Sequence, residues 1–580
     1  MGATRNAGWL KRLAFDRGGA LTIAALAFYV WQACPYVVEL DNAEFSTLGA
    51  AGGGAHPSGY PLYVVWLRLW SWLPTSAAHA ASIATAVLGA SAIAILHAAC
   101  RAWGARPLAA TLATGAFAAA PLVARYHTTA EAFALNNLIV ACVLWLAAAT
   151  GPVRGTRRAI ALGLVAGLGM TNHMTCALLA PVGLLGLARA AAESSRRWTA
   201  VVAASAAYLV GLAPYAYLFV APENLQAWPH PDGLGGLFDI ILRRDYGGAF
   251  SFSGGDSNAP VVDHLVELAR SIGRSWLWIA PALAFAVLGR RLAKPGRGES
   301  RAAWAALTAS FLLAGPLLAT RFDTPVNWVG GYIVHRFHLI PILILTIPIA
   351  VGLDSLAARL RLPAIADGAL GVAAFGAIAA TSLPYLARFH SPAIEHGARN
   401  MLRSLPPNSV VMATIELDVT ARYLQLTQRE RPDVLIVRIE DMAIGWYRAR
   451  FAAYGIRWQP TPDAQPDLDL ARYLLDLGRP VFVHPQAASL IARFPSYRHG
   501  TLVRLVPDRA AVPALAELEV LNRAIYDAFD LDYSFPGGND EFATQKHREY
   551  ASTWKQLGDQ RSRSGLSPAE DYERARKLGR

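Results

Sequence analysis

Long apolar runs alternate with short polar connections over the first two-thirds of the chain. Each run is long enough to cross about 30 Å of hydrocarbon as a helix. The region 158–189 holds two shorter helices, because the polar step TNHMT interrupts it. The other runs are residues 19–38, 78–100, 107–124, 133–149, 199–220, 275–290, 302–319, 337–357 and 364–386. The pattern predicts an α-helical polytopic membrane protein with about eleven transmembrane helices.

Arginine and lysine gather in every second connection between these runs. Basic loops stay on the cytoplasmic side, so the N-terminus is expected in the cytoplasm, and the residues after about 388 outside. The first run is long and QACPYVVELD is a poor cleavage site, so we interpret it as a retained span rather than a signal peptide. The basic residues are Lys11, Arg12, Arg17, Arg101, Arg106, Arg154, Arg157, Arg158, Arg196, Arg197, Arg290, Arg291, Lys294, Arg297, Arg301, Arg359 and Arg361.

Beyond residue 388, short apolar segments alternate with helical ones. NSVVMATI, PDVLIVRI, RPVFVHP and TLVRLVP are typical of buried strands, and TARYLQLTQRE and DLARYLLDLG are typical of the helices between them. This alternation predicts a small parallel α/β domain. We expect a transmembrane domain at 1–388 with a first outward loop at 39–77, an outward soluble α/β domain at 389–540 and a polar helical tail at 541–580.

Composition supports a membrane protein and argues against nucleic-acid binding. Of the 580 residues, 54% are hydrophobic and only 16% are charged, which is too apolar for a soluble protein of this size. Lys and Arg outnumber Asp and Glu by 53 to 41, but much of this excess lies in cytoplasmic loops, where anionic lipid headgroups explain it. The cysteines show no metal-ligand spacing, so we expect small core residues and no metal site. They are Cys34, Cys100, Cys142 and Cys176.

The first outward connection presents acids, glycines and a histidine in quick succession, in ELDNAEFSTLGAAGGGAHPSGYPLY. Asp41 and Glu44 are three residues apart, so a helical turn would place both on one face. Helix capping or solvation is an equally good explanation of such acids. The glycines lack the Gly-Lys-Ser/Thr of a nucleotide phosphate loop. The following LYVVWLRLWSWLP, with Arg68 among tryptophans, suits a helix in the membrane interface.

Polar residues also occur in later outward connections. Ionisable groups at membrane depth are costly, so each is a candidate functional residue, although paired structural roles are common. Because all of them fall at the same membrane face, we favour one functional site. They are Arg125, His127 and Glu131 in RYHTTAEAFALNN, Asn172 and His173 in TNHMT, and Arg336 and His338 in HRFHL.

A series of motifs resembles the protein O-mannosyltransferase-like family, long catalogued as a domain of unknown function. The motifs are LDNAEF, AHPSGYPLY, AEAFALN, GMTNHMT, LRRDYGGAF, VHRFHLIP and RPDVLIVRI followed by GWYRARF. The resemblance runs from about residue 20 to about residue 450. The family pattern reads D-S-G-E-F, A-H-P-P-G-Y-P-L, E-V-Y-A-L-N and G-N-H, and its first two elements together are specific.

This resemblance implies a GT-C glycosyltransferase that uses a polyprenyl-phosphate sugar donor, a catalytic carboxylate in the first outward loop, and no cofactor. Matched residue by residue, the family's functional positions fall on Asp41, Glu44, His56, Glu131 and His173. The chain departs from the pattern at Ala43, Ser58 and Phe133, and FVAPENLQAWPHP lacks an arginine that is often found there.

The chemistry also follows from the residue types. A carboxylate at the outer membrane face can take the proton of an attacking hydroxyl, while arginine and histidine donors stabilise the leaving phosphate. One base is enough for an inverting transfer. We therefore predict Asp41 as the general base. The resemblance implies transfer of mannose to a protein Ser or Thr, and a glycan or lipid hydroxyl would need the same base. We expect the protein in a bacterial inner membrane. Donor or acceptor binding is expected from Glu44, His56, Tyr60, Arg68, Glu131, Asn172, His173, Arg336 and His338.

Two further expectations concern the outward domain and the main alternative function. We expect the domain after residue 390 to handle the acceptor. Its acids at strand ends are interpreted as caps or loop carboxylates; they are Glu416, Asp418, Glu440 and Asp441. A transporter or lipid flippase would also have many spans and buried polar residues. Transporters usually show paired inverted halves, and no such pairing is visible in this sequence. An enzyme is therefore the favoured reading.

Overall fold

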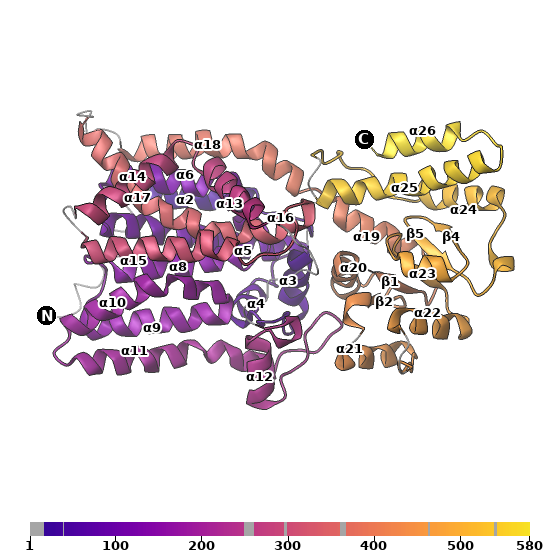
Figure 1. Ribbon diagram of the computed structural model, residues 1–580, viewed down its shortest axis with the longest axis horizontal. Coiled ribbons are helices and arrows are strands. Elements are labelled where there is room, and N and C mark those ends of the chain that lie inside the picture. Colours follow the sequence, from indigo (N-terminus) through magenta and orange to yellow (C-terminus); the bar gives the residue numbers. More distant parts are fainter. Residues whose placement is uncertain are drawn as a thin grey trace. The chain divides into compact units, whose positions relative to one another are not determined.

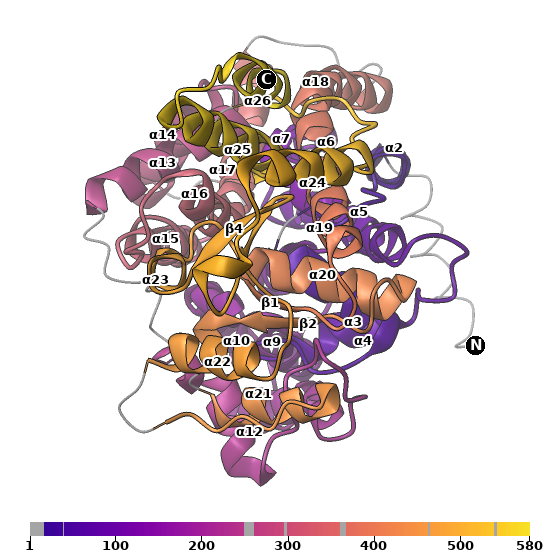
Figure 2. The same cartoon turned by 90° about the vertical axis from the view of Figure 1, so that its right-hand side faces the viewer.

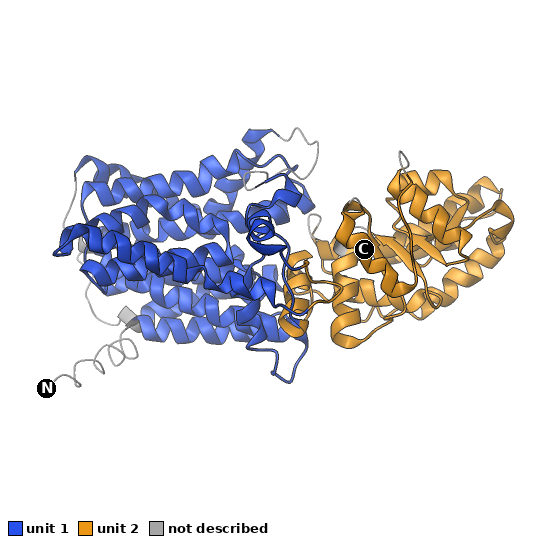
Figure 3. Cartoon of the chain, turned by 90° about the horizontal axis from the view of Figure 1, so that it is seen from below, with its two compact units in different colours: residues 1–35, 52–222, 230–387 blue, residues 36–51, 223–229, 388–580 orange. Residues whose placement is uncertain are grey.

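The structure is a computed structural model that describes residues 17–38, 40–248, 260–294, 299–359, 367–413, 415–442, 444–461, 465–538 and 542–579. Lys11, Arg12, Arg297 and Arg361 therefore lie outside the described residues. The chain divides into two compact units (Figure 3). The first comprises Met1–Pro35, Gly52–Pro222 and His230–Ala387, and the second comprises Tyr36–Ala51, Glu223–Pro229 and Arg388–Arg580. This division differs from the predicted one, because two short early segments and the tail join the second unit.

The first unit is built from long helices that run side by side in Figure 1. Every apolar run predicted from the sequence lies on one of them or on a bent pair. The helices are α2 (Arg17–Trp31), α5 (Ala77–Ala102), α6 (Pro107–Ala119), α7 (Pro121–Thr128), α8 (Phe133–Ala147), α9 (Gly155–Asn172), α10 (Ala180–Glu193), α11 (Arg197–Gly211), α14 (Ala280–Ala293), α15 (Arg301–Leu312), α17 (Leu339–Arg359) and α18 (Asp367–Phe389). The expected break at TNHMT is confirmed, because α9 ends at Asn172 and a 3-10 helix, η1 (Met174–Leu179), begins two residues later.

Within the described ranges, five helices are long and apolar enough to cross a membrane, or seven if two bent pairs each count as one span. The pairs are α6 with α7, bent by 66°, and α13 (Val261–Ser275) with α14, bent by 103°. Two shorter apolar helices, Gly18–Trp31 and Phe133–Ala147, add to these. The chain is thus a multi-pass membrane protein, and the count of eleven spans stays a prediction.

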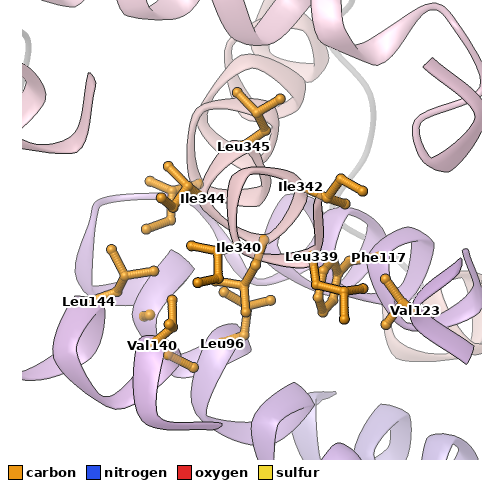
Figure 4. Packing of buried hydrophobic residues seen from close by; sticks show 14 of the residues in the cluster. Leu96, Phe117, Val123, Val140, Leu144, Leu339, Ile340, Ile342, Ile344 and Leu345 are labelled. Carbon is orange, nitrogen blue, oxygen red and sulfur yellow. The ribbon is translucent and has the colours of Figure 1, made fainter. Parts of the chain in front are cut away.

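Helix α17 lies in the middle of the hydrophobic core of the first unit. Figure 4 shows its residues 339–345 among Leu96 of α5, Phe117 of α6 and Leu144 of α8. Leu339, Leu343 and Leu345 are fully buried. An apolar run without polar interruption is therefore consistent with a helix that is enclosed by other helices on all sides.

Glycines bring α9 and α11 into close contact. A Cβ atom at Gly163 would lie 2.1 Å from the Ala204 carbonyl oxygen, and one at Gly167 would lie 2.2 Å from that of Tyr208. Gly163 and Gly167 form the four-residue spacing that allows membrane helices to approach closely. The two backbones can reach this separation only because both positions lack a side chain.

The second unit contains a five-stranded sheet in the order β2-β1-β3-β5-β4. Its strands are β1 (Val410–Ala413), β2 (Leu435–Arg438), β3 (Val481–Val483), β4 (Ser496–His499) and β5 (Leu502–Leu505). In Figure 2, α20 (Ile415–Gln428) lies on one side of the sheet and α22 (Pro466–Asp476) on the other. The remaining helices are α3 (Leu40–Ala51), α19 (Ala393–Ser404), α21 (Gly445–Ala449), α23 (Ala488–Arg493), α24 (Leu515–Asp527), α25 (Phe542–Arg563) and α26 (Ala569–Leu578).

The second unit combines this sheet with helices, but the sheet is mixed and not parallel as predicted. Strands β2, β1 and β3 are parallel, whereas β5 and β4 run antiparallel to their neighbours. The missed strand, β4, has the sequence SYRH and lacks an apolar run. It forms because a tight turn with Gly500 at φ +59° pairs His499 with Leu502 of β5. The tail is helical as predicted, and α25 packs against α19.

Candidate active site

The two acids of the loop that was predicted to face outward lie on α3, in the second unit. Asp41 is half-buried in the first turn of the helix, where a negative charge is favourable. Glu44 lies one turn later and is only 6% exposed. The predicted helical turn is thus present, and it places both carboxylates on neighbouring positions of one face. The roles of Asp41 and Glu44 stay predictions.

The chain before α3 is held by the second unit. The backbone N–H of Val37 donates to Glu395 Oε2 of α19 at 3.1 Å, and that of Val38 donates to Asn42 Oδ1 at 3.1 Å. Glu395 Oε1 in turn accepts from Arg399 at 2.8 Å, and α3 packs against α20. The position of Asp41 therefore depends on residues more than 350 positions later in the chain.

A glycine-rich turn in the first unit follows α3. Gly52, Gly53 and Gly59 have φ values of +80°, +118° and +93°, which side chains rarely adopt. Tyr60 also has a positive φ, +46°, and it directly precedes Pro61 at the start of α4 (Pro61–Arg68). Strained backbone at a residue other than glycine persists only where its surroundings enforce it, and such residues gather at functional sites.

Aromatic side chains connect the turn with the break between α9 and η1. The ring of Tyr60 lies 5.0 Å from that of His56 and 5.7 Å from that of His173. The His173 ring also lies 4.8 Å from that of Phe133. His173 Nδ1 lies 2.8 Å from Thr175 Oγ1, which fixes the ring. The structure thus brings together three predicted site residues, His56, Tyr60 and His173.

The rings of His56, Tyr60, His173 and Phe133 form what we call the aromatic row, and a buried charge cluster adjoins it. Tyr332 of α16 (Trp328–His335) donates to Glu131 Oε1 at 2.9 Å, and Arg336 Nη1 lies 4.0 Å from Glu131 Oε2. The Arg336 guanidinium stacks 4.8 Å from the Tyr332 ring and 5.8 Å from that of Phe133. Arg125 lies 5.7 Å from the same Tyr332 ring. Two arginines and one glutamate leave this cluster with a net positive charge, which suits an anionic ligand.

Tyr332 was not predicted as a site residue. Its sequence signal was its spacing, because it lies four residues before Arg336 and so shares a helix face with it. Phe133 was noted only as a departure from the family pattern. In the structure it joins the His173 ring to the Arg336 guanidinium.

Other predicted site residues have structural surroundings. Asn172 is fully buried and donates to the Ala132 carbonyl at 3.2 Å. His338 Nδ1 lies 2.9 Å from Ser271 Oγ on α13, away from the Arg336 cluster. Arg68 ends α4, about 12 Å along the helix from Tyr60. Binding roles for these residues are therefore not suggested by the contacts described above.

The loop sequence FVAPENLQAWPHP is held in part by arginines of the second unit. Arg450 donates to the Leu225 carbonyl at 2.7 Å and also to Ala227, and Arg422 donates to Leu225. Arg422 forms an ion pair of 2.8 Å with Asp418, which is fully buried. The expectation that Asp418 is a cap or loop carboxylate is therefore wrong: it lies within α20 and neutralises the arginine that holds this loop.

A mostly apolar groove of about 510 Å³ lies in the first unit between α8, α9, α10 and α11. One end is marked by Met170 and Cys176, which flank His173 on either side. The lining extends along α9 to Leu162, about 12 Å away. The groove thus follows the apolar surfaces of these helices and reaches the two chain segments on either side of His173.

Comparisons with known proteins agree with this picture. Residues 41–196 match the family model described as the Protein O-mannosyl-transferase TMEM260 N-terminal domain. Protein O-mannosyl-transferase TMEM260 of Mus musculus is 25% identical over 456 residues, which cover 73% of this chain and 64% of that protein. The Dictyostelium discoideum protein of that name is 22% identical over 484 residues, 74% of this chain and 58% of its own length. The chain thus spans less than two-thirds of either relative.

The fold matches solved structures. ArnT from Cupriavidus metallidurans, bound to undecaprenyl phosphate, superposes with a TM-score of 0.52 at 14% identity, over 87% of this chain and 99% of that one. The apo structure of ArnT gives the same TM-score over 88% and 100%. The resemblance to the protein O-mannosyltransferase-like family seen in the sequence is therefore confirmed, and the chain is a multi-pass membrane protein with the fold of ArnT.

Proposed function

We propose that the chain is a membrane glycosyltransferase. In this proposal it moves a mannose-like sugar from a polyprenyl-phosphate donor to an outward-facing hydroxyl, preferably of a protein Ser or Thr, with inversion at the anomeric carbon. The relatives named above are called protein O-mannosyl-transferases, and ArnT was solved with undecaprenyl phosphate. The proposed location is a bacterial inner membrane, with the N-terminus in the cytoplasm and the second unit outside.

The observation that carries the proposal is the groove whose lining includes Met170 and Cys176, three residues before and three residues after His173. A polyprenyl phosphate has an apolar chain and one anionic head, so its site must join an apolar channel to a cluster of cations. Here Met170 and Cys176 line the groove. Between them in the chain lies His173, whose ring contacts Phe133, and the Phe133 ring in turn contacts the Arg336 guanidinium. A planar guanidinium can bind a phosphate through two hydrogen bonds.

The proposed chemistry needs one base near this head group. Asp41 accepts the proton of the attacking hydroxyl, and the arginines stabilise the charge that develops on the leaving phosphate. Attack from the side opposite the phosphate inverts the anomeric centre, so no covalent enzyme intermediate is required. Glu44 then orients Asp41 or contacts the acceptor. Four residues of chain, 52–55, separate the end of α3 from His56 in the first unit.

The test is sugar transfer from labelled polyprenyl-phosphate mannose to a Ser/Thr peptide by detergent-purified protein, with and without a chelator. Asp41→Asn keeps size and hydrogen bonding but removes the proton acceptor, so transfer should fall by about 10²-fold or more while donor binding survives. Glu44→Gln should have a milder effect. Near-normal transfer by a folded Asp41→Asn protein would exclude this base. No transfer by the parent with any lipid-linked sugar would favour the transporter alternative.

A further inference from the structure

Helix α12 (Gly233–Ile241) carries apolar side chains on two opposite faces. Ile240, on the inner face, is buried. Leu234, Phe238 and Leu242 recur every four residues on the other face and are 71%, 58% and 39% exposed. Residues four apart lie above one another on a helix, so these three form one continuous apolar stripe. A helix that displays such a stripe to water would be unfavourable.

The inner face attaches α12 to the end of a membrane span. The span Arg197–Phe219 ends in the 3-10 helix η2 (Ala213–Phe219). A Cβ atom at Gly59 would lie 2.9 Å from Leu218 of η2 and 3.5 Å from Ile240 of α12, so these side chains meet at one point. The end of a span marks the boundary of the hydrocarbon region. Helix α12 therefore lies at the level where lipid headgroups begin.

The surroundings of η2 are also apolar and exposed. Val220, the next residue after η2, is 76% exposed. Helix α4 packs against η2, and the residues that follow α4 include Leu69 and Trp72, which are 61% and 74% exposed. The stripe on α12 is thus part of a wider apolar surface around one span end.

Basic residues follow the stripe directly. The Arg243 guanidinium lies 5.5 Å from the ring of Tyr246, and Arg244 pairs with Asp239 at 2.6 Å. Asp239 and Asp245 balance these two arginines in charge, so any contact with lipid depends on the reach of the guanidinium groups and not on a net charge. Long cationic side chains at this position can reach lipid phosphates while their apolar neighbours enter the acyl region.

We propose that α12 is an interfacial helix that docks on one leaflet of a phospholipid bilayer. Leu234, Phe238 and Leu242 enter the leaflet, and Arg243 and Arg244 contact the phosphates. The helix thereby fixes the loop between two spans on the membrane surface, independently of the reaction that the protein catalyses.

The test uses the full chain in vesicles of phosphatidylcholine and phosphatidylglycerol. A spin label is placed at position 238 through Phe238→Cys in a background in which the four native cysteines are alanine, and its collisions with oxygen and with a water-soluble nickel chelate are compared. Val520→Cys on α24, 70% exposed in the second unit, is the matched control. The ratio of oxygen to nickel accessibility should be several-fold higher at 238 than at 520. An equal or lower ratio overturns the proposal.

A second measurement avoids the cysteine replacements. The photoreactive residue p-benzoylphenylalanine at position 238 of the otherwise unchanged protein should give a lipid adduct by mass spectrometry. An adduct to a second protein chain, or no adduct at all, contradicts lipid docking. If Arg243 and Arg244 bind anionic lipid, the nickel accessibility at position 238 should rise in vesicles without phosphatidylglycerol. An unchanged accessibility would show that the two arginines do not bind anionic lipid.

Discussion

The backbone N–H of Val37 donates a hydrogen bond of 3.1 Å to Glu395 Oε2, 358 residues further along the chain. This bond ties the connection that precedes α3 to α19, which follows the last long apolar helix. Because α3 also packs against α20, the proposed catalytic helix belongs structurally to the C-terminal unit. Deleting the residues after 388 would therefore remove the support of Asp41 as well as any acceptor surface, so point substitutions are the cleaner test.

Glu395→Ala should lower the turnover number of transfer by about tenfold, with little change in the KM for the donor. The substitution leaves the buried Val37 N–H without its acceptor, which costs about 1–3 kcal/mol and loosens the entry into α3. Glu395→Gln keeps an acceptor oxygen and should restore most of the activity. Glu430→Ala is the control, since it breaks the ion pair with Arg399 but leaves the Val37 bond intact. Equal losses in Glu395→Ala and Glu430→Ala would argue against the positioning role.

Arg336→Lys should raise the KM for the polyprenyl-phosphate donor by about tenfold. Lysine keeps the charge but loses the planar group that stacks on Tyr332 at 4.8 Å and can bind phosphate through two hydrogen bonds. Arg359→Lys, at the exposed end of α17, serves as the control. If Arg336→Lys used limiting donor as well as the parent, the phosphate would have to be bound elsewhere.

Gly183→Phe should impair donors with long prenyl chains and leave short-chain donors almost unaffected. Gly183 lines the groove and has open space where a Cβ would be, so a phenyl ring can enter the groove without displacing the backbone. Gly289→Phe on α14 is the control, because its Cβ position is also open and it lies outside the groove lining. A uniform effect on both donor lengths would mean that the groove does not bind the prenyl chain.

Gly167→Ala should destabilise the first unit, whereas Gly183→Ala should be tolerated. The new methyl group at position 167 would lie 2.2 Å from the Tyr208 carbonyl oxygen, so α9 and α11 would have to separate. Overpacking of this kind costs about 1–3 kcal/mol or more. Thermal melting in detergent checks this, and equal melting temperatures for the two variants would contradict the close packing of the helices.

Asp433→Asn should destabilise the second unit in a pH-dependent way. Two hydrogen bonds from Arg431, at 2.9 and 2.8 Å, lower the pKa of Asp433 to about 2. A carboxylate with a lowered folded-state pKa stabilises the fold above its unfolded pKa, near 4, and loses this contribution as the pH falls towards 2.

At pH 7 the free energy of unfolding of Asp433→Asn should be about 1 kcal/mol lower than that of the parent. The difference is small because the Arg431–Asp433 ion pair is partly exposed. The difference in melting temperature should shrink as the pH is lowered from 5 to 3. Asp476→Asn, at the end of α22, is the control. If the difference in melting temperature between the parent and Asp433→Asn were independent of pH, the charge of Asp433 would not contribute to the stability of the fold.

The sequence was sufficient to predict the class of the protein and most of its helices and strands. Hydrophobic length and periodicity are local properties, so the apolar runs, the break at TNHMT and four of the five strands were visible without the fold. The motifs around Asp41, His56 and His173 are also local, because each is a short run of residues with a fixed spacing. They therefore indicated a family without knowledge of the fold. The same local signals did not predict β4. This strand forms because the turn at Gly500 brings it to the edge of β5, with which it pairs.

Only the tertiary structure decided which of these polar residues meet. His56 and Tyr60 share one segment, whereas His173 and Arg336 come from two others, and Phe133 joins His173 to Arg336 through contacts that no sequence spacing reveals. Asn172 and His338 had the same sequence signal, but their side chains bind neighbouring helices. Residue type and membrane depth nominate a polar side chain, whereas the packing of distant helices determines whether it faces a site or a structural partner.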